Sequence, residues 1–177
     1  TMEVEALAAG TYQLVRADDR TLTCNIPDLP SDELLVGPWE VSFAAGSGTP
    51  CEVVLHQLAS WTDHEDFEVQ HYSGTARYRR EFELPKRFQE AVLPDRCVYL
   101  DLGRVEVIAT VSLNGERLAT LWKPPFRLDI TDALCGGANS LEIAVTNLWP
   151  NRLIGDEKYP ADAEYGGLYL QLYLIHI

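Results

Sequence analysis

An Asn-Gly pair between two β-prone segments is the feature that most restricts how this chain can fold. Residues 105–113, which are rich in β-branched side chains, run directly into Asn114-Gly115, and residues 116–122 follow as a second extended segment. Asparagine and glycine both accept the positive φ angles of a type I′ turn, whose twist matches that of two paired strands. The sequence therefore predicts a tight antiparallel hairpin at this point.

Alternation of apolar and polar residues extends this prediction to much of the chain. In residues 75–84, Ala76 and Tyr78 fall on one face of a strand, whereas Arg77 and Arg79 fall on the other. No stretch carries apolar residues at helical spacing over the length of a helix, so the pattern indicates an all-β, antiparallel β-sandwich. Further strands are predicted at residues 52–56, 97–102, 126–130 and 141–145, with a short helical turn at residues 131–134.

The length of 177 residues and a hydrophobic content of 46% suit one domain with a substantial core. We assign residues 1–36 to N-terminal strands and a connector of that domain, and residues 37–177 to the sandwich itself. The closing segment, residues 160–177, contains a β-prone apolar run. That run is either the last strand or an exposed edge through which the molecule self-associates.

The charge balance excludes several classes of partner. The chain carries 14 basic and 27 acidic residues, which gives a net charge of −13. Nucleic-acid phosphates require a basic footprint, so nucleic acid is not an expected partner, and an anionic membrane surface is disfavoured for the same reason. No apolar run is long enough to span a bilayer, and the N-terminal residues do not have the pattern of a signal peptide. A neutral glycan is compatible with this charge.

Neither the cysteines nor the acidic residues form a recognisable catalytic or zinc-binding pattern. Cys24, Cys51, Cys97 and Cys135 include no C-x-x-C pair and have no histidine at zinc-like spacing. Disulfide pairing and free thiols therefore both remain open. A glycosidase needs two carboxylates held across the scissile bond, but chance clusters of acids are expected among 27 of them. We assign no catalytic residue.

Several short motifs occur in a fixed order between residues 37 and 157. They are Gly37-Pro38-Trp39, Tyr99-Leu100-Asp101-Leu102-Gly103, Leu113-Asn114-Gly115, Pro125-Phe126, Asp129-Ile130-Thr131 and Asn151-Arg152-Leu153-Ile154-Gly155-Asp156. In these motifs the chain resembles the C-terminal β-sandwich of the glycoside hydrolase family 106 α-L-rhamnosidases, which is related to the sugar-binding domain of family 2 enzymes. The last motif is the most selective for the rhamnosidase group.

The resemblance implies a galactose-binding-like jelly roll whose parent enzyme carries its catalytic carboxylates on a separate domain. It also implies a non-catalytic carbohydrate-binding module or accessory domain of a larger glycoside hydrolase, secreted or periplasmic in a bacterium. The expected partners are that catalytic domain and a plant cell-wall polysaccharide, such as rhamnose-containing pectin. Two alternatives remain: a purely structural domain that buttresses the catalytic domain, and a small autonomous hydrolase.

Sugar binding requires flat aromatic surfaces and convergent polar groups for the hydroxyls. Several of the candidates also have a structural alternative. Trp61 and Trp149 would plug the ends of the sandwich, Arg152 and Asp156 would form an ion pair that fixes a loop, and the segment around Trp149 would serve an interface with a catalytic domain. The aromatic candidates are Trp61, Trp122, Trp149 and Tyr159, and the polar candidates close to Trp149 are Asn147, Asn151, Arg152 and Asp156.

A structural Ca²⁺ is the remaining expectation, because the resemblance is to jelly rolls that often carry one. Calcium takes about six to eight oxygen ligands, including backbone carbonyls. No D-x-D-x-D-G loop is present, and the sequence does not locate the site. The carboxylates that could contribute are Asp63, Glu65, Asp66 and Asp101.

Overall fold

The computed structural model describes residues 6, 8–26, 31–44, 49–50, 52–89 and 97–158. The chain divides into two compact units. The larger unit comprises Val36–Leu84 and Cys97–Ile177, and the smaller comprises Thr1–Leu35 and Pro85–Arg96. Each unit contains its own antiparallel strands.

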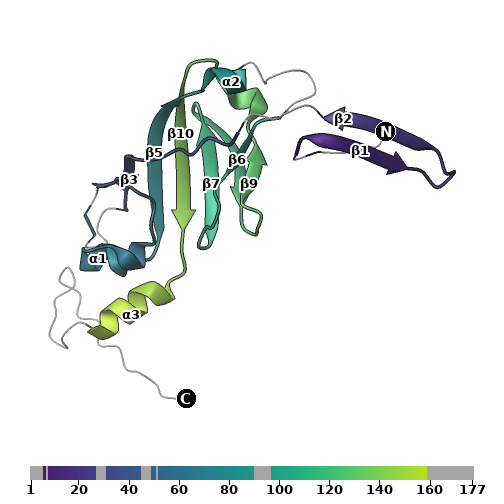
Figure 1. The fold of residues 1–177 in the computed structure, drawn as a ribbon. Helices are drawn as coiled ribbons and strands as arrows, with labels where there is room; N and C mark the ends of the chain where they lie inside the picture. The colour runs from purple at the N-terminus through teal and green to yellow at the C-terminus, as the bar shows by residue number, and fades with distance from the viewer. Residues whose placement is uncertain are drawn as a thin grey trace. The chain divides into compact units, whose positions relative to one another are not determined.

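The larger unit is built around a six-stranded antiparallel sheet with the strand order β4-β3-β5-β10-β7-β8. The long strand β10 hydrogen-bonds to β5 along one edge and to β7 along the other, and Figure 1 shows β10 between these two strands. The strands of this sheet are β3 (Trp39–Ser42), β4 (Glu52–Leu55), β5 (Thr75–Glu83), β7 (Ile108–Leu113), β8 (Glu116–Leu121) and β10 (Ala138–Thr146).

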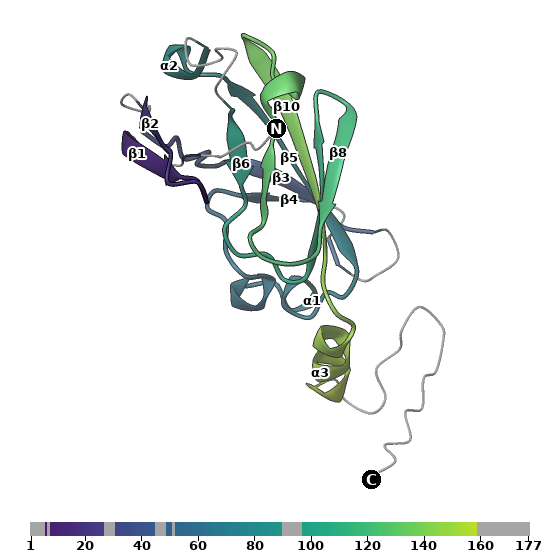
Figure 2. The same ribbon diagram turned by 90° about the vertical axis from the view of Figure 1, so that its right-hand side faces the viewer.

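A second sheet pairs β6 (Tyr99–Asp101) with β9 (Arg127–Asp129). The pairing continues beyond both strands, because Leu102 N donates to Phe126 O over 2.8 Å and Ile130 N donates to Val98 O over 2.9 Å. Figure 2 shows β6 apart from the strands β8 and β10 of the large sheet. The predicted all-β, antiparallel sandwich is confirmed. Its short helical segments are η1 (Trp61–Asp63), α1 (Phe67–Gln70) and η2 (Thr131–Ala133).

One face of the large sheet forms the hydrophobic core. Residues directly opposite each other in antiparallel strands share a face, and the register places Val41, Tyr78, Ile143 and Val111 in one row across four strands. All four are buried, with at most 9% of their surface exposed. Outside the large sheet, the core includes Phe43, Val69, Tyr72, Phe126 and Ile130.

The opposite face of the sheet is polar, as the alternation in residues 75–84 predicted. Arg77 and Arg79 are exposed on β5, and both pair with Glu142 on β10, over 3.1 and 2.8 Å respectively. The hydrogen bond from Arg79 is the main reason that the pKa of Glu142 is lowered, with a further contribution from Arg77. On this face, Glu142 is thus flanked by two arginines.

The predicted hairpin joins β7 to β8. Asn114 has a φ of 54° and Gly115 a φ of 83°, as a type I′ turn requires. The Asn114 side chain also ties the turn to the rest of the unit, because its Nδ2 donates to Ala133 O and its Oδ1 accepts from Ser140 N, over 2.8 and 2.9 Å. The first strand of the hairpin begins at Ile108 rather than at residue 105.

The smaller unit contains an antiparallel hairpin of β1 (Gly10–Val15) and β2 (Thr21–Ile26), together with the short helix α2 (Lys86–Gln89). Within this unit Arg87 forms an ion pair with Glu33. The assignment of residues 1–36 to the same domain as the sandwich stays a prediction. The closing segment, residues 160–177, lies outside the described residues.

The helix α3 (Pro150–Lys158) occupies nine residues where the sequence pattern indicated a loop. That prediction was wrong because the search was for an apolar stripe facing the core, and α3 has none: Leu153 and Ile154 are exposed, while Gly155 is its only buried residue. None of the helices in the described residues is long and apolar enough to cross a membrane.

Candidate functional site

The predicted sugar-binding segment lies at the end of the large sheet where β10 leads toward α3. Figures 1 and 2 both place α1 at this end. The helix α1 begins at its N-cap Asp66, whose Oδ1 accepts hydrogen bonds from Glu68 N over 2.9 Å and from Val69 N over 3.2 Å. Aspartate is a preferred N-cap because it satisfies free N–H groups of the first helical turn. We call residues 66–74 and 147–158 the α1–α3 junction.

Two asparagines close the junction by binding backbone groups. The Nδ2 of Asn147 donates to Tyr72 O over 2.7 Å, and its Oδ1 accepts from Gly74 N over 2.9 Å. The Nδ2 of Asn151 donates to Gln70 O over 2.8 Å and to Tyr72 O over 2.9 Å. These bonds satisfy backbone groups at the last residue of α1 and in the turn that follows it. They also fix the start of α3 against α1.

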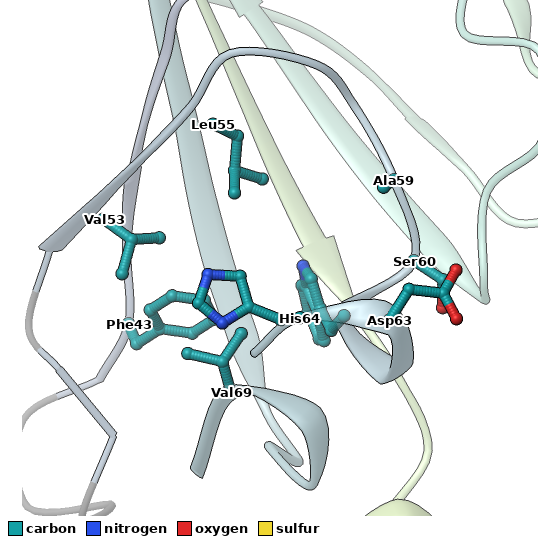
Figure 3. Close-up of a pocket in the computed structure, with 9 residues that line it drawn as sticks. Phe43, Val53, Leu55, Ala59, Ser60, Asp63, His64 and Val69 are labelled. Atoms are coloured by element: carbon teal, nitrogen blue, oxygen red, sulfur yellow. The ribbon is translucent and has the colours of Figure 1, made fainter. Parts of the chain in front are cut away.

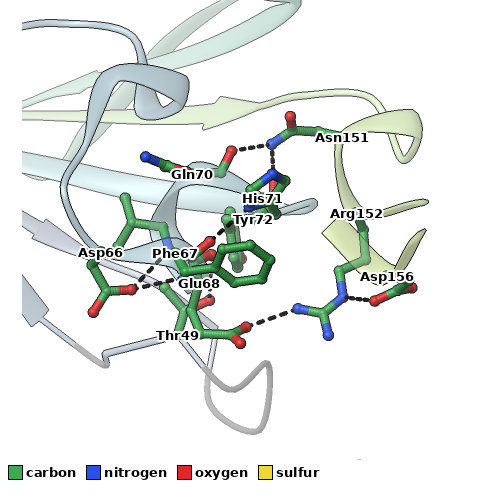
Figure 4. A network of polar contacts seen from close by, with 11 residues as sticks. Thr49, Asp66, Phe67, Glu68, Gln70, His71, Tyr72, Asn151, Arg152 and Asp156 are labelled. Carbon is green, nitrogen blue, oxygen red and sulfur yellow. Dashed lines mark hydrogen bonds and ion pairs between the residues drawn. The ribbon is translucent and has the colours of Figure 1, made fainter. Parts of the chain in front are cut away.

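Arg152 joins α3 to α1 by ion pairs, as Figure 4 shows. Its Nη1 lies 2.9 Å from Glu68 Oε2, and its Nε lies 2.8 Å from Asp156 Oδ1. The three side chains are each only 23% or 24% exposed. The pairs are therefore less screened by water than surface pairs, whose net contribution to stability is small.

Gly155 allows α3 to approach α1 closely. A Cβ atom at this position would lie 2.5 Å from the Cβ of His71. The buried His71 is itself held on both sides, because its Nδ1 lies 2.9 Å from Phe67 O and its Nε2 lies 3.0 Å from Lys158 Nζ. A carbonyl oxygen only accepts, so Nδ1 carries the proton toward Phe67 and Nε2 accepts from the Lys158 ammonium.

The four polar residues that were predicted to bind sugar hydroxyls therefore do meet at one place, but they are bonded to their own domain. The side-chain amides of Asn147 and Asn151 bind the backbone, and Arg152 pairs with Asp156 and with Glu68. Trp149, which would supply the stacking surface, is 69% exposed. A contact between any of these residues and a sugar stays a prediction.

Trp61 lies in an aromatic cluster at the same end of the sandwich. Its Nε1 donates to the hydroxyl of Tyr78, and its ring packs edge-on against Phe43 and Tyr72, with centroids 5.8 and 5.5 Å apart. Burial raises the pKa of Tyr78, although the hydrogen bond with Trp61 opposes this. This is the geometry expected if Trp61 plugs the end of the sandwich.

A small pocket lies beside Trp61, and Figure 3 shows its mostly apolar walls. At its edge the Nδ1 of His64 already accepts a hydrogen bond from Asp66 N, over 3.0 Å. Sugar sites present several converging polar groups to the hydroxyls, and this pocket does not. It is lined by Phe43, Val53, Leu55, Ala59, Ser60, Trp61, Asp63, His64 and Val69.

The remaining two aromatic candidates are not part of the junction in the described residues. Trp122 follows β8, the edge strand of the large sheet, and is 66% exposed. The ammonium of Lys123 lies over the Trp122 ring, 5.3 Å from the ring centroid. Tyr159 lies outside the residues that the structure describes.

Each carboxylate considered as a calcium ligand either accepts a hydrogen bond from a nearby backbone N–H group or is exposed to solvent. Asp66 caps α1, and Asp101 accepts from Gly103 N over 2.7 Å, while Asp63 and Glu65 are exposed. In the described part of the chain, no three His, Cys, Asp or Glu side chains gather as a metal site. Calcium binding stays a prediction. Of the cysteines, Cys24 and Cys135 are free thiols, the side chain of Cys97 hydrogen-bonds to Asp129, and Cys51 lies outside the described residues.

Sequence reasoning missed the α1 side of the junction. Glu68 and His71 were not singled out, although they hold Arg152 and Lys158. One signal was available: Arg152 and Asp156 are four residues apart, the spacing at which opposite charges meet on a helix. No comparable signal pointed to Glu68 or His71, because their partners lie more than 80 residues away along the chain.

Comparison with known proteins shows which family the chain matches and which proteins it is similar to. Residues 57–168 match the family model described as "Glycosyl hydrolase 2 galactose-binding domain-like". A curated "Putative beta-glucuronidase" from Formosa agariphila is 41% identical over 158 residues, which make up 89% of this chain and 13% of that protein.

Solved structures resemble the chain in the same way. A rhamnosidase from Novosphingobium sp. PP1Y is 35% identical with a TM-score of 0.67, and the match covers 81% of this chain and 14% of that one. A beta-glucuronidase from Lactobacillus rhamnosus is 25% identical with a TM-score of 0.54, over 66% of this chain and 21% of that one. The chain thus spans only a small part of each of these relatives.

Proposed function

Because the chain belongs to the glycosyl hydrolase 2 galactose-binding domain-like family, we propose that it serves as a non-catalytic accessory domain of a larger glycoside hydrolase. The similarity to a rhamnosidase over 81% of the chain, together with the motif of residues 151–156, supports a more specific proposal about the parent enzyme. In this proposal the parent is an exported enzyme of the glycoside hydrolase family 106 type.

The observation that carries the proposal is the use of polar side chains at the α1–α3 junction. A sugar-binding or hydrolytic site keeps polar groups free to meet the ligand. Here Asn147, Asn151 and Arg152 are committed to bonds of 2.7 to 2.9 Å within the domain. Such bonds rigidify the end of the sandwich, which is what a domain that supports a neighbour requires.

A second candidate function is binding of a plant cell-wall polysaccharide, and Trp122 favours it. Its indole is 66% exposed, and exposed aromatic faces stack against the apolar side of sugar rings. Trp149 offers a second such surface, at 69% exposure. In this reading the two tryptophans supply the contact, while the junction supplies only rigidity.

Activity measurements on the chain itself test the proposal. We expect no release of nitrophenol from nitrophenyl α-L-rhamnoside or β-glucuronide, because no acid pair is assigned. Turnover by the purified chain that disappears on substitution of one carboxylate would contradict the accessory role.

Affinity electrophoresis in gels that contain rhamnose-rich pectin tests the second candidate. Binding through the tryptophans predicts retardation that Trp122→Ala or Trp149→Ala reduces, whereas Leu58→Ala, a matched change at another exposed apolar residue, leaves it intact. Equal mobility with and without every polysaccharide tried would reject sugar binding and leave the accessory role as the sole function proposed.

A further inference from the structure

The α3 segment is oriented opposite to an ordinary surface helix. In such a helix the apolar stripe faces the core and the polar side faces water. Here four apolar residues that follow β10 or belong to α3 face outward, and we call them the outer apolar face. They are Leu148, Trp149, Leu153 and Ile154, with exposed fractions of 58%, 69%, 40% and 52%.

The inner side of α3 prevents the helix from rolling over to bury this face in its own domain. Asn151 and Arg152 are bonded to α1. Gly155 packs so closely on His71 that a Cβ atom there would lie 2.5 Å from the histidine Cβ. Rotating the helix would break these bonds and bring larger side chains into a space that fits only glycine. The outer apolar face is therefore held in place and remains uncovered by the described domain.

The four exposed apolar residues lie within seven consecutive positions of the chain. Trp149 immediately precedes α3, and Leu153 N donates to Trp149 O over 3.5 Å, so these two residues lie one turn apart. Leu148 and Ile154 adjoin them in sequence. Contiguous apolar surface of this kind marks an interaction site in soluble proteins. Tryptophan is among the residues enriched at the positions that dominate binding at protein interfaces.

The chemistry of the outer apolar face favours a protein rather than a sugar. The polar groups nearest to Trp149 in sequence, Asn147, Asn151 and Arg152, are bonded on the inner side. A sugar would therefore find an aromatic ring without partners for its hydroxyls. A complementary apolar protein surface needs no such partners.

We propose that the outer apolar face docks against the catalytic domain of the same polypeptide. The chain spans 13% of its curated relative and 14% of the solved rhamnosidase, so most of such an enzyme is available to supply this partner. The inference rests on the proposed accessory function and names the surface through which it is exerted.

Oxidative footprinting with hydroxyl radicals tests the docking directly. Trp149 and Trp122 are a matched pair, because they are 69% and 66% exposed. In the isolated chain both are oxidised at similar rates. In the full-length enzyme we expect oxidation of Trp149 to fall to about a tenth, as the core of a protein interface excludes solvent, while oxidation of Trp122 relative to a free tryptophan standard falls less. Equal protection of the two would overturn the proposal.

Charge substitution provides an independent test. Ile154 and Leu58 are both 52% exposed, so Ile154→Glu and Leu58→Glu should leave the melting temperature of the isolated chain unchanged. In the full-length enzyme, Ile154→Glu should make the boundary of this domain sensitive to limited proteolysis, and Leu58→Glu should not. Equal proteolysis of the two variants counts against docking at α3.

Other occupants give different results, and each would overturn the proposal. Protection of Trp149 in the isolated chain at every concentration would mean that residues 159–177 cover the face. Protection that rises with protein concentration would mean a second copy, and protection on addition of pectin would mean a sugar. Failure of the accessory function is separate, since it would show as hydrolysis by the isolated chain whether or not Trp149 is protected in the full-length enzyme.

Discussion

The two ends of β10 are both closed by asparagine side chains, but they differ in what they expose. At the first end, Asn139 is 2% exposed and makes four hydrogen bonds. It accepts from Cys135 N and from the Asn114 side chain, and donates to Cys135 O and Gly137 O, over 2.8 to 3.0 Å. The full capacity of the amide is used, and the residues before it in the chain, 136–138, are two glycines and an alanine.

At the second end, the asparagines also satisfy the backbone, but the helix that follows exposes its apolar side. Asn147 and Asn151 hold α3 in place, while Trp149 and Ile154 face outward. The comparison shows that both ends satisfy their backbone hydrogen bonds, so hydrogen bonding alone does not indicate which end has a surface suited to binding a partner. The exposed apolar side chains at the second end are what indicate such a surface.

Replacing Asn139 should have the largest effect on stability. Asn139→Ala removes the side-chain partners of Cys135 N and Cys135 O, whereas Gly137 O keeps its hydrogen bond from Leu84 N. Each polar group left without a partner costs about 1–3 kcal/mol. We expect a loss of about 3 kcal/mol in the free energy of unfolding, since larger losses from one substitution are exceptional. Urea unfolding followed by fluorescence measures it. Ser140→Ala, a change at the next and exposed residue, should alter stability by less than about 0.5 kcal/mol. Similar losses for the two variants would show that Asn139 does not close the first end.

Adding one methyl group at the second end should have an intermediate effect. Gly155→Ala places a Cβ against His71, and such overpacking costs about 1–3 kcal/mol. The better helix propensity of alanine offsets up to about 1 kcal/mol of this. Hydrogen exchange should therefore show faster exchange for the amides of α3 but not for those of β10.

Gly136 is the matched control, because nothing lies within 4 Å of a Cβ at that position. Gly136→Ala should leave exchange in α3 unchanged. An α3 that exchanges at the same rate in both variants would mean that contact with His71 does not hold the second end.

The smallest effect concerns the middle of β10. The hydrogen bond from Arg79 lowers the pKa of Glu142 in the folded state, so the carboxylate adds stability at neutral pH. That contribution is lost as the pH falls below about 4.3, the ordinary value, and through the lowered folded pKa. Glu142→Gln should therefore be slightly less stable than the parent at pH 7, with the difference gone at strongly acidic pH.

Unfolding curves at several pH values, repeated in an Arg79→Gln background, measure this effect. The difference should shrink in that background because the main cause of the pKa shift is removed. A difference that does not depend on pH would mean that the pair does not stabilise the folded state.

The sequence predicted those parts of the fold in which local chemistry and tertiary structure agree. The Asn114-Gly115 turn follows from backbone preference alone, and the faces of β5 follow from alternation of Ala76 and Tyr78 with Arg77 and Arg79. Motif resemblance led to the correct broader group, a galactose-binding-like domain of glycoside hydrolases.

The α3 segment could not be predicted from the same signals. Its helix is stabilised by contacts of Asn151, Arg152 and Gly155 with a segment about 80 residues earlier. An apolar pattern read by itself assigns Trp149 and Leu153 to a core or to a ligand. The polar residues were recognised as a group, but only the structure shows that they face α1.

The continuous backbone from β10 to α3 also determines how this end would carry a mechanical load. β10 is opposite nine residues of β5 and six of β7, and Asn147 clamps its exit to Tyr72 and Gly74. A pull on α3 along the strand would act on all of these hydrogen bonds in shear, side by side, rather than opening them one after another. A neighbouring domain attached to α3 would thus be connected to a strand that is hydrogen-bonded along both of its edges.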